Sequence, residues 1–333
     1  MNELNCELYT IAWIAPLPIE ATAALYMLDN RHAGRFPMSR GDDYVFQAGD
    51  ACGHNIVVAS LPAGQEHGSG SAAALASQVK KNFPNLWFGL LVGVAAGLPN
   101  LSLSPPRDIR LGDVLVGLPD GDGDSAGLVA YDLGRETGFH GFQLFSSGHV
   151  LAVTETVVRS AIGSIKLRAP READSFLEYY RRIEGEEHSD GTFTDPGQSF
   201  DRLYQTDEDD SQFIIYRRQR PEHRRTRVWY GSIGSGEKLI KNAQRRDDLR
   251  DRYGLIGLET AAAGTMNRIP VGVIRGVCDY ADEHNYKQWQ PYAAAMAAAY
   301  AKAVLAELTP NDAANSRVDF KQLKQPTPTP TTH

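Results

Sequence analysis

Short apolar runs alternate with helix-like stretches along most of the chain. Residues 8–15 (LYTIAWIA) form an apolar run that ends at two prolines, a pattern typical of a buried strand that continues into a loop. Glu20 then begins a helical stretch, residues 45–62 predict two strands around a Gly/His/Asn turn, and residues 70–82 predict an alanine-rich helix. The first third of the chain is therefore predicted to consist of strands separated by helices.

The alternation continues to about residue 308, with one interruption. Further strands or strand-to-helix units are expected at 86–99, 127–132, 228–240, 253–264 and 271–282, and a final helix at 291–308. Strands that alternate with helices predict an α/β fold with a central, mostly parallel twisted sheet flanked by helices.

The interruption lies between about residues 155 and 227. It contains an acidic run, TDEDDSQ, and a basic run from Arg217 to Arg227. We interpret it as a surface insertion in a single catalytic domain that spans residues 1–308, with a helix candidate at its start. Residues 309–333 contain few apolar side chains and a Pro/Thr repeat, which predicts a disordered tail or linker.

Composition and charge narrow the class of protein. The 333 residues carry a formal net charge of -7, so no global positive field exists to attract nucleic acid. The three cysteines lie far apart, which predicts neither a disulfide framework nor a zinc site. No signal peptide and no apolar run of about 18 residues is recognisable, so we expect a cytoplasmic protein without a membrane partner.

Carboxylates follow three of the expected strands. Ligands of open α/β sheets bind beyond the carboxyl ends of the strands, where the sequence places Glu20, Glu259 and Asp279. Cleavage of a purine N-glycosidic bond needs a proton for the leaving base, stabilisation of a ribose oxocarbenium ion and an activated nucleophile. An Asp in apolar surroundings can retain the proton, and two Glu can activate water and bind ribose. This chemistry requires neither a metal nor a cofactor.

Six motifs with their order and spacing resemble one known superfamily. They are IAWIAPLPIEA, LLVGVAAGLPN, DIRLGDVLVG, GSIGSGEKLI, GLIGLETAAAG and VIRGVCDYAD. Together they resemble the purine nucleoside phosphorylase and nucleosidase superfamily, in particular methylthioadenosine/adenosylhomocysteine nucleosidases and the fungal domains fused to NACHT, ankyrin or TPR regions. The match covers residues 8–150 and 228–308.

The resemblance implies a role for each carboxylate. Glu20 falls where the nucleosidases place the Glu that positions water, Asp279 where the superfamily protonates the purine, and Glu259 where it binds ribose. Leu239 and Ile240 fall where the base is lined and hydrogen-bonded through the backbone, presented by a turn at Ser235 and Gly236. The full set of residues expected to bind substrate is Glu259, Leu258, Val94, Ala95, Gly97, Ser235, Leu239 and Ile240.

Two departures from the superfamily pattern favour water over phosphate as the nucleophile. Val94 stands where a Ser is common, and a valine side chain cannot donate a hydrogen bond to an anion. The Gly-Asp-Pro type of loop with a phosphate-binding Arg is absent. A third departure, Gly257 in place of a Glu, leaves the sugar contacts open.

Structural explanations compete with these roles. Glu20 could stabilise the first turn of its helix, and Asp279 or Glu259 could cap one. Asp282 is expected to be structural, and His67 is left out of the catalytic set because a lone loop histidine more often lies at the surface.

The sequence therefore predicts hydrolysis of a purine ribonucleoside, adenosine first and guanosine second, to free base and ribose. Three alternatives stay open: a phosphorylase, an ATP N-glycosidase of a defence system, and a non-catalytic sensing or oligomerisation module. In the second, the basic run would reach over a cleft and bind phosphates, although such runs are usually solvated. The resemblance also implies a homo-oligomer, a dimer or larger.

Overall fold

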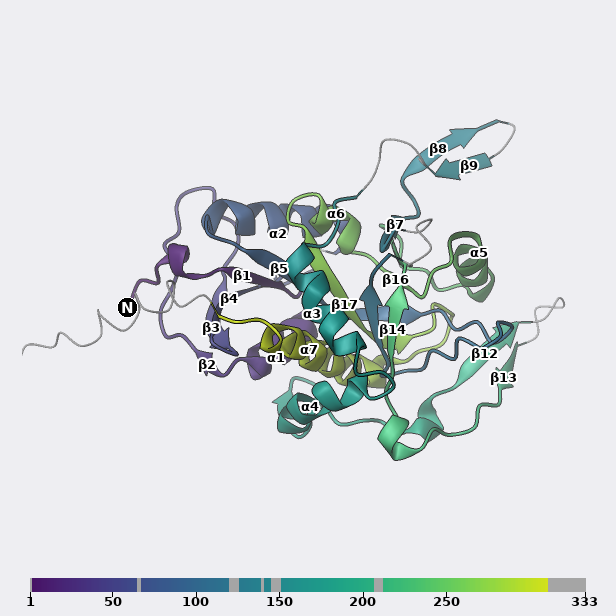
Figure 1. Ribbon diagram of the computed structural model, residues 1–333. Coiled ribbons are helices and arrows are strands. Elements are labelled where there is room, and N and C mark those ends of the chain that lie inside the picture. The colour runs from purple at the N-terminus through teal and green to yellow at the C-terminus, as the bar shows by residue number, and fades with distance from the viewer. Residues whose placement is uncertain are drawn as a thin grey trace, which may run out of the picture.

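A computed structural model describes most of the chain (Figure 1). The described residues are 2–64, 67–119, 126–138, 141–144, 151–206 and 212–310. The centre of the sheet consists of four neighbouring parallel strands in the order β17 (Val271–Asp279), β5 (Phe88–Gly97), β1 (Ile11–Ile14) and β4 (His54–Ala59). These strands are almost wholly buried, as expected of parallel strands covered on both faces.

Antiparallel pairs extend the sheet at both sides. Next to β4, β3 (Gln47–Ala51) and β2 (Asn30–Arg31) form an antiparallel edge. On the other side, β6 (Val114–Gly117) is antiparallel to β17 and parallel to β14 (Val228–Gly231). The predicted fold class, a mostly parallel sheet flanked by helices, is confirmed.

A branch of three strands leaves the main sheet where β5 ends. There β16 (Gly257–Glu259) pairs antiparallel with β5, and β15 (Ile233–Ser235) lies between β16 and β7 (Leu128–Ala130). The branch carries Glu259 to the carboxyl ends of β5 and β17, where the chemistry was expected.

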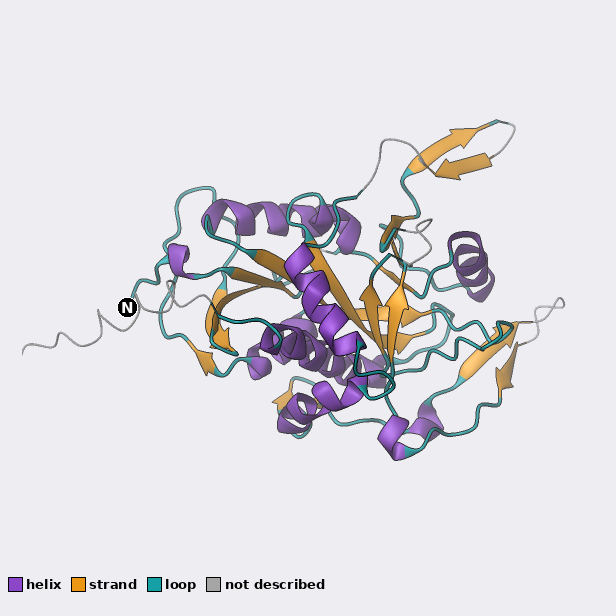
Figure 2. Cartoon of the chain, in the orientation of Figure 1, coloured by secondary structure: helices purple, strands orange, loops and turns teal. Residues whose placement is uncertain are grey.

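Helices lie on both faces of the sheet (Figure 2). They are α1 (Pro18–Met27), α2 (Gly68–Asn82), α3 (Thr156–Lys166), α4 (Leu177–Ile183), α5 (Ala243–Tyr253), α6 (Ala262–Met266) and α7 (Gln290–Ala306). Short 3-10 turns span Cys6–Leu8, Glu172–Ser175, Gln198–Phe200, Glu222–Arg224 and Lys287–Trp289. In Figure 1, α2 lies beside α6 on one side, and α1, α4 and α7 pack together on the other.

The last helix, α7, is buried all round, which explains its alanine-rich sequence. It packs on β17 and β5, and a Cβ built on Gly276 of β17 would lie 1.9 Å from the carbonyl oxygen of Ala293. Only glycine on the strand and small residues on the helix allow this approach.

The segment from 155 to 227, predicted as a surface insertion, contributes its first two helices to the core. Phe176 before α4 and the apolar face of α3 are buried, and both helices pack on α7. The rest of the segment contains two small hairpins, of which the later one projects from the body, as does an earlier hairpin outside the segment (Figure 2). Their strands are β8 (Gly134–Thr137) with β9 (Gly141–Leu144), β10 (Glu187–His188) with β11 (Gly191–Thr192), and β12 (Leu203–Thr206) with β13 (Gln212–Ile215).

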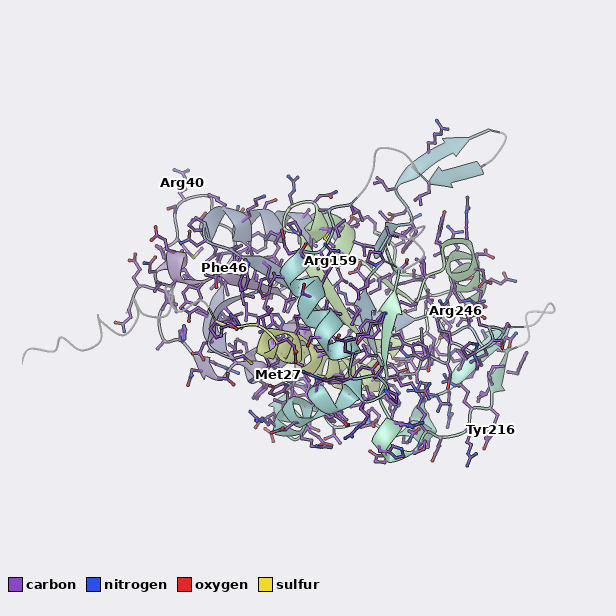
Figure 3. The ribbon with its side chains drawn as sticks, viewed as in Figure 1. Met27, Arg40, Phe46, Arg159, Tyr216 and Arg246 are labelled. Carbon is purple, nitrogen blue, oxygen red and sulfur yellow. The ribbon has the colours of Figure 1, made fainter. Side chains whose placement is uncertain are left out.

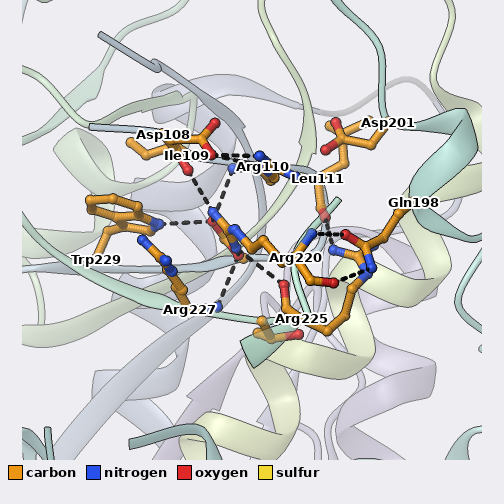
Figure 4. Close-up of polar contacts among 12 residues, drawn as sticks. Asp108, Ile109, Arg110, Leu111, Gln198, Asp201, Arg220, Arg225, Arg227 and Trp229 are labelled. Carbon is orange, nitrogen blue, oxygen red and sulfur yellow. Dashed lines mark hydrogen bonds and ion pairs between the residues drawn. The ribbon is translucent and has the colours of Figure 1, made fainter. Parts of the chain in front are cut away.

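Three arginines of the basic run, Arg217, Arg220 and Arg225, form internal ion pairs, whereas Arg218 and Arg224 are exposed. Figure 4 shows the contacts around Arg220. Asp113 is 0% exposed and accepts two hydrogen bonds from the Arg220 guanidinium, at 2.6 and 3.0 Å. The Asp113 carboxylate also accepts hydrogen bonds from the backbone N–H of Arg227 and from the indole N–H of Trp229. Because the side chain of Arg225 is likewise buried against Asp195, the run attaches the segment to the domain.

Tyr216 and Met27 mark the surface and the interior of the fold. Figure 3 shows Tyr216, just after β13, at the edge of the molecule, whereas Met27 at the end of α1 lies in the interior. No helix among the described residues is long and apolar enough to cross a membrane. The tail predicted from residue 309 lies, apart from its first two residues, outside the described residues.

Candidate active site

A cavity of about 850 Å³ opens at the carboxyl ends of β1, β5 and β17. Its walls come from the loop and helix after β1, the end of β5, the branch strand β16 and the turn after β17. Glu20, Glu259 and Asp279 all line it, although more than 200 residues separate Glu20 from the other two. The sheet topology thus brings together the three carboxylates that the sequence singled out.

Glu20 lies in the first turn of α1 and is buried at the bottom of the cavity. Its Oε2 accepts a hydrogen bond from the backbone N–H of Leu17 at 2.8 Å, and its Oε1 accepts one from Val94 N–H at 2.7 Å. The first contact stabilises the helix start, and the second fixes the carboxylate against β5. A Cβ built on Gly93 would lie 2.0 Å from Oε1, so this approach requires a glycine.

Arg275, which the sequence analysis missed, lies between two of the carboxylates. Its side chain, 2% exposed, projects from β17 and forms an ion pair with Glu259, while its Nη1 lies 3.7 Å from Oε1 of Glu20. A buried charge needs a partner, so an arginine inside the apolar run VGVIRGVCD was a readable signal.

Burial raises the pKa of the Glu20 carboxyl above its ordinary value, against the opposing effects of Arg275 and the two N–H donors. A carboxylate with a raised pKa is a stronger proton acceptor near neutral pH. Since each carboxylate oxygen has two lone-pair directions, Glu20 retains capacity to accept a hydrogen bond from a water molecule.

Glu259 combines a structural and a potential binding role. Its Oε2 accepts hydrogen bonds from the N–H groups of Ala261 and Ala262 and from Arg275. Among the described residues, its Oε1 accepts one hydrogen bond, from Ala262 N–H at 3.0 Å. The carboxylate therefore caps the start of α6, as the structural explanation predicted. Oε1 keeps one lone pair for a hydroxyl donor in the cavity.

Asp279 ends β17, lines the same cavity and has a side chain that is 16% exposed. Its Oδ1 accepts from Ala281 N–H at 2.8 Å, and its Oδ2 lies 3.4 Å from Nζ of Lys241. The Asp282 carboxylate takes no part in this contact. It accepts hydrogen bonds from His284 N–H at 2.9 Å and from the Tyr286 hydroxyl at 3.1 Å, which agrees with the structural role expected for it.

The same architecture occurs in solved nucleosidase structures. The chain superposes with a TM-score of 0.58 and 18% identity on 5'-methylthioadenosine/S-adenosylhomocysteine nucleosidase from Neisseria meningitidis in complex with methylthio-immucillin-A, over 90% of this chain and 99% of that one. It superposes with a TM-score of 0.56 and 17% identity on futalosine hydrolase of Helicobacter pylori, over 90% and 99%.

The chain has the nucleosidase fold.

This confirms, for the fold, the resemblance drawn from the six motifs. In sequence, the chain is 35% identical over 317 residues to a nucleotide-binding leucine-rich repeat (NLR)-like protein of Hyaloscypha variabilis. That match covers 91% of this chain but 30% of the relative, so the chain spans about a third of that protein's length. No protein-family model matches the chain.

Apolar residues line the cavity of this nucleosidase fold both beside the carboxylates and at the rim. Val94, Ala95 and Leu258 lie beside the carboxylates, and Leu239 and Ile240 lie in the loop after β15. Leu239 is 70% exposed at the rim. These positions suit contact with a flat apolar ligand such as a nucleobase.

The loop that carries Leu239 is tied to both sides of the cavity. The Tyr131 hydroxyl donates to the carbonyl of Lys238 at 3.0 Å, and the Glu237 carboxylate accepts from Ser69 and from Gly70 N–H at the start of α2. None of these contacts was predicted, because they join segments that are far apart in the sequence.

Two residues expected to bind substrate lie outside the cavity walls. Gly97 lies where β5 pairs with Gly257, and a Cβ there would meet Val277 at 2.7 Å, so it serves packing. Ser235 is buried, and its hydroxyl oxygen accepts a hydrogen bond from Ala263 N–H at 2.9 Å. This contact helps to fix the first turn of α6. Gly257 has no room for the missing glutamate, because a Cβ would lie 2.3 Å from Leu115.

The hypothesis that the basic run binds phosphates is not supported by its placement. Arg217 and Arg225 are paired with buried or half-buried aspartates, and no residue from 217 to 227 lines the cavity. Lysines line the rim instead, namely Lys238, Lys241 and Lys287, together with His67 and His284. Among the described residues, no group of three or more His, Cys, Asp and Glu is arranged to hold a metal ion.

Proposed function

We propose that this chain is a purine nucleosidase, which hydrolyses the N-glycosidic bond of a purine ribonucleoside to free base and ribose. The observation that supports this most directly is that Glu20, which lies beside Arg275, and Asp279 line the same cavity in a nucleosidase fold. The first group suits a general base and the second suits a general acid.

In the proposed reaction, Asp279 donates a proton from Oδ2 to N7 of the purine as the C1'–N9 bond breaks. Glu20 accepts a proton from water, whose oxygen forms the new bond to C1' of the ribose. The base leaves neutral, and one proton has moved from water to Glu20 and one from Asp279 to the base. Glu259 accepts a hydrogen bond from a ribose hydroxyl at Oε1 and orients the sugar.

The charges at the bottom of the cavity support water over phosphate. Arg275 is already shared by Glu20 and Glu259, and the Val94 side chain offers no hydrogen-bond donor. A phosphate anion placed there would lie beside two carboxylates with only one paired cation, which is electrostatically unfavourable. Water carries no such cost.

The decisive experiment is release of free base from adenosine, guanosine, inosine and methylthioadenosine, each with and without inorganic phosphate, followed by chromatography. We expect adenine from adenosine as the fastest product, guanine second, and no dependence on phosphate. A strict need for phosphate would instead make the chain a phosphorylase. Absence of turnover with retained nucleoside binding would leave a sensing module.

A nucleotide is the second candidate substrate, and the rim lysines are the observation that favours it. Lys238, Lys241 and Lys287 surround the opening through which a 5'-substituent would leave the cavity. Adenine release from ATP and AMP should then exceed release from adenosine, and Lys287→Met should remove the difference. Equal rates for all three substrates would exclude a phosphate contact at the rim.

A further inference from the structure

The turn after Asp279 holds an unusual backbone conformation. Ala281 has φ of +53°, in the left-handed region that residues other than glycine rarely adopt. In this turn the Ala281 N–H donates a hydrogen bond to Oδ1 of Asp279, at 2.8 Å. Alanine pays a conformational cost there, so surrounding contacts must hold the turn.

One set of contacts comes from the hairpin segment, defined as residues 201–206 and 212–217. The buried Tyr280 hydroxyl donates to Asp201 and accepts from Arg217 at 2.8 Å. Arg217 also binds Asp201 directly, at 2.8 Å. Burial and the neighbouring Asp201 raise the pKa of Tyr280 well above its ordinary value, so its hydroxyl remains a donor.

The far side of the turn is held by the same hairpin segment. Tyr204 stacks on His284 with 3.4 Å between ring centroids, and the Tyr286 hydroxyl lies 3.1 Å from the carbonyl of Arg202. From α5, Arg246 donates to the carbonyl of Tyr280 at 3.1 Å. Figure 3 shows Arg246 on the side of the molecule that carries this hairpin. The turn is thus held by the hairpin segment and by α5, neither of which directly follows a strand that carries one of the three carboxylates.

We propose that Asp201, Arg217 and Tyr280 are positioning residues. They hold the turn in which Ala281 is left-handed, so that the Ala281 N–H stays on Oδ1 and Asp279 stays aimed at the leaving base. With Oδ1 engaged by Ala281, Oδ2, which lies 3.4 Å from Lys241 Nζ, is the oxygen from which the proton would be donated. This inference rests on the proposed function and gives the hairpin segment a role in it. None of the three residues touches the cavity itself.

The test uses two substrates that differ in their need for a proton. A purine leaves only when protonated, whereas the nitrophenolate of 4-nitrophenyl β-D-ribofuranoside leaves without one. In Tyr280→Phe, we expect kcat for the purine nucleoside to fall about 10- to 100-fold, as for a displaced general acid, with KM within about twofold. Hydrolysis of the nitrophenyl riboside should stay within about threefold of wild type.

A rescue variant separates positioning from simple damage to the fold. Glycine adopts the left-handed conformation at little cost, so Ala281→Gly added to Tyr280→Phe should restore most of the lost kcat. Asp201→Asn should show the same selective loss of kcat for the purine nucleoside, and adding Ala281→Gly should restore most of it. The matched control is Tyr9→Phe, which removes a hydroxyl bound to His32 at 2.8 Å outside the cavity and should change neither rate.

The outcomes distinguish this inference from the proposed function. If wild type releases no base from any purine nucleoside, the proposed function fails. If wild type is active and Tyr280→Phe lowers kcat equally for both substrates, or for neither, the positioning role is wrong. Failure of Ala281→Gly to restore activity in a folded double variant overturns it as well, even if wild type does not accept the nitrophenyl riboside.

Discussion

The bottom of the cavity and its rim are built in opposite ways. At the bottom, Glu20, Glu259 and Arg275 are buried, and backbone N–H groups or ion pairs fix each carboxylate. At the rim, Leu239 is 70% exposed and Lys241 is 42% exposed. The bottom is therefore fixed by internal contacts, whereas the rim presents its side chains to solvent. Under the proposed function, the first region would set the reaction type and the second the choice of nucleoside.

The largest expected effects come from removing the proposed base or acid. Glu20→Gln and Asp279→Asn should each lower kcat by about 100- to 10,000-fold, because general acid or base groups contribute on that order. Base release by chromatography measures the loss, and circular dichroism checks that both variants stay folded. A folded Asp279→Asn enzyme with near wild-type activity would remove the proposed acid.

The next largest effect concerns stability. Arg275→Met leaves Glu20 and Glu259 buried without their cation, and breaking a buried ion pair on one side costs about 3–5 kcal/mol. Urea unfolding monitored by fluorescence should show this decrease in the free energy of unfolding. The matched rim variant, Lys287→Met, should change it by less than about 0.5 kcal/mol. Equal losses would contradict the contrast between the two regions.

A pH effect should follow from the raised pKa of Glu20. The base must be ionised, so kcat/KM should fall about tenfold per pH unit once the pH drops below this raised pKa, above the ordinary 4.5. The same shift means that folding favours the protonated form, so the contribution of Glu20 to stability decreases as the pH rises through its folded pKa. A pH–rate profile with parallel circular dichroism separates loss of the base from unfolding.

The smallest effect is expected at the rim. Leu239→Ala removes apolar contact with the base and should raise KM several-fold while leaving kcat within about twofold, since such burial contributes on the order of 1–2 kcal/mol to both ground and transition states. Steady-state kinetics with adenosine and guanosine measure it. A large fall in kcat would mean that this loop takes part in the chemistry.

Much of the fold was readable from the sequence because period and composition are local signals. Apolar runs ending in Pro or Gly marked β1 and β5, an apolar run ending in carboxylates marked β17, and the alanine-rich stretch marked α7. The carboxylates were readable because they follow strands, and parallel strands end at one edge of the sheet.

The misread parts depend on distant partners. Local charge made the run from Arg217 to Arg227 look solvated or phosphate-binding, whereas its partners include Asp108 and Asp113, more than 100 residues earlier. The Lys241–Asp279 contact was missed for the same reason, because nothing in the sequence near either residue indicates the other. Gly97 and Ser235 were assigned to the ligand because small residues near a site serve packing and binding with the same sequence pattern.

The burial of α7 on every side has a consequence for how the chain is made. A ribosome adds residues from the N-terminus, so every strand of the sheet is synthesised before the helix that packs on β5 and β17. Until that helix emerges, the sheet keeps one apolar face uncovered, a state that favours aggregation. Nascent chains of this protein should therefore depend on chaperones until translation has passed residue 306, and a stop codon just upstream should yield insoluble product.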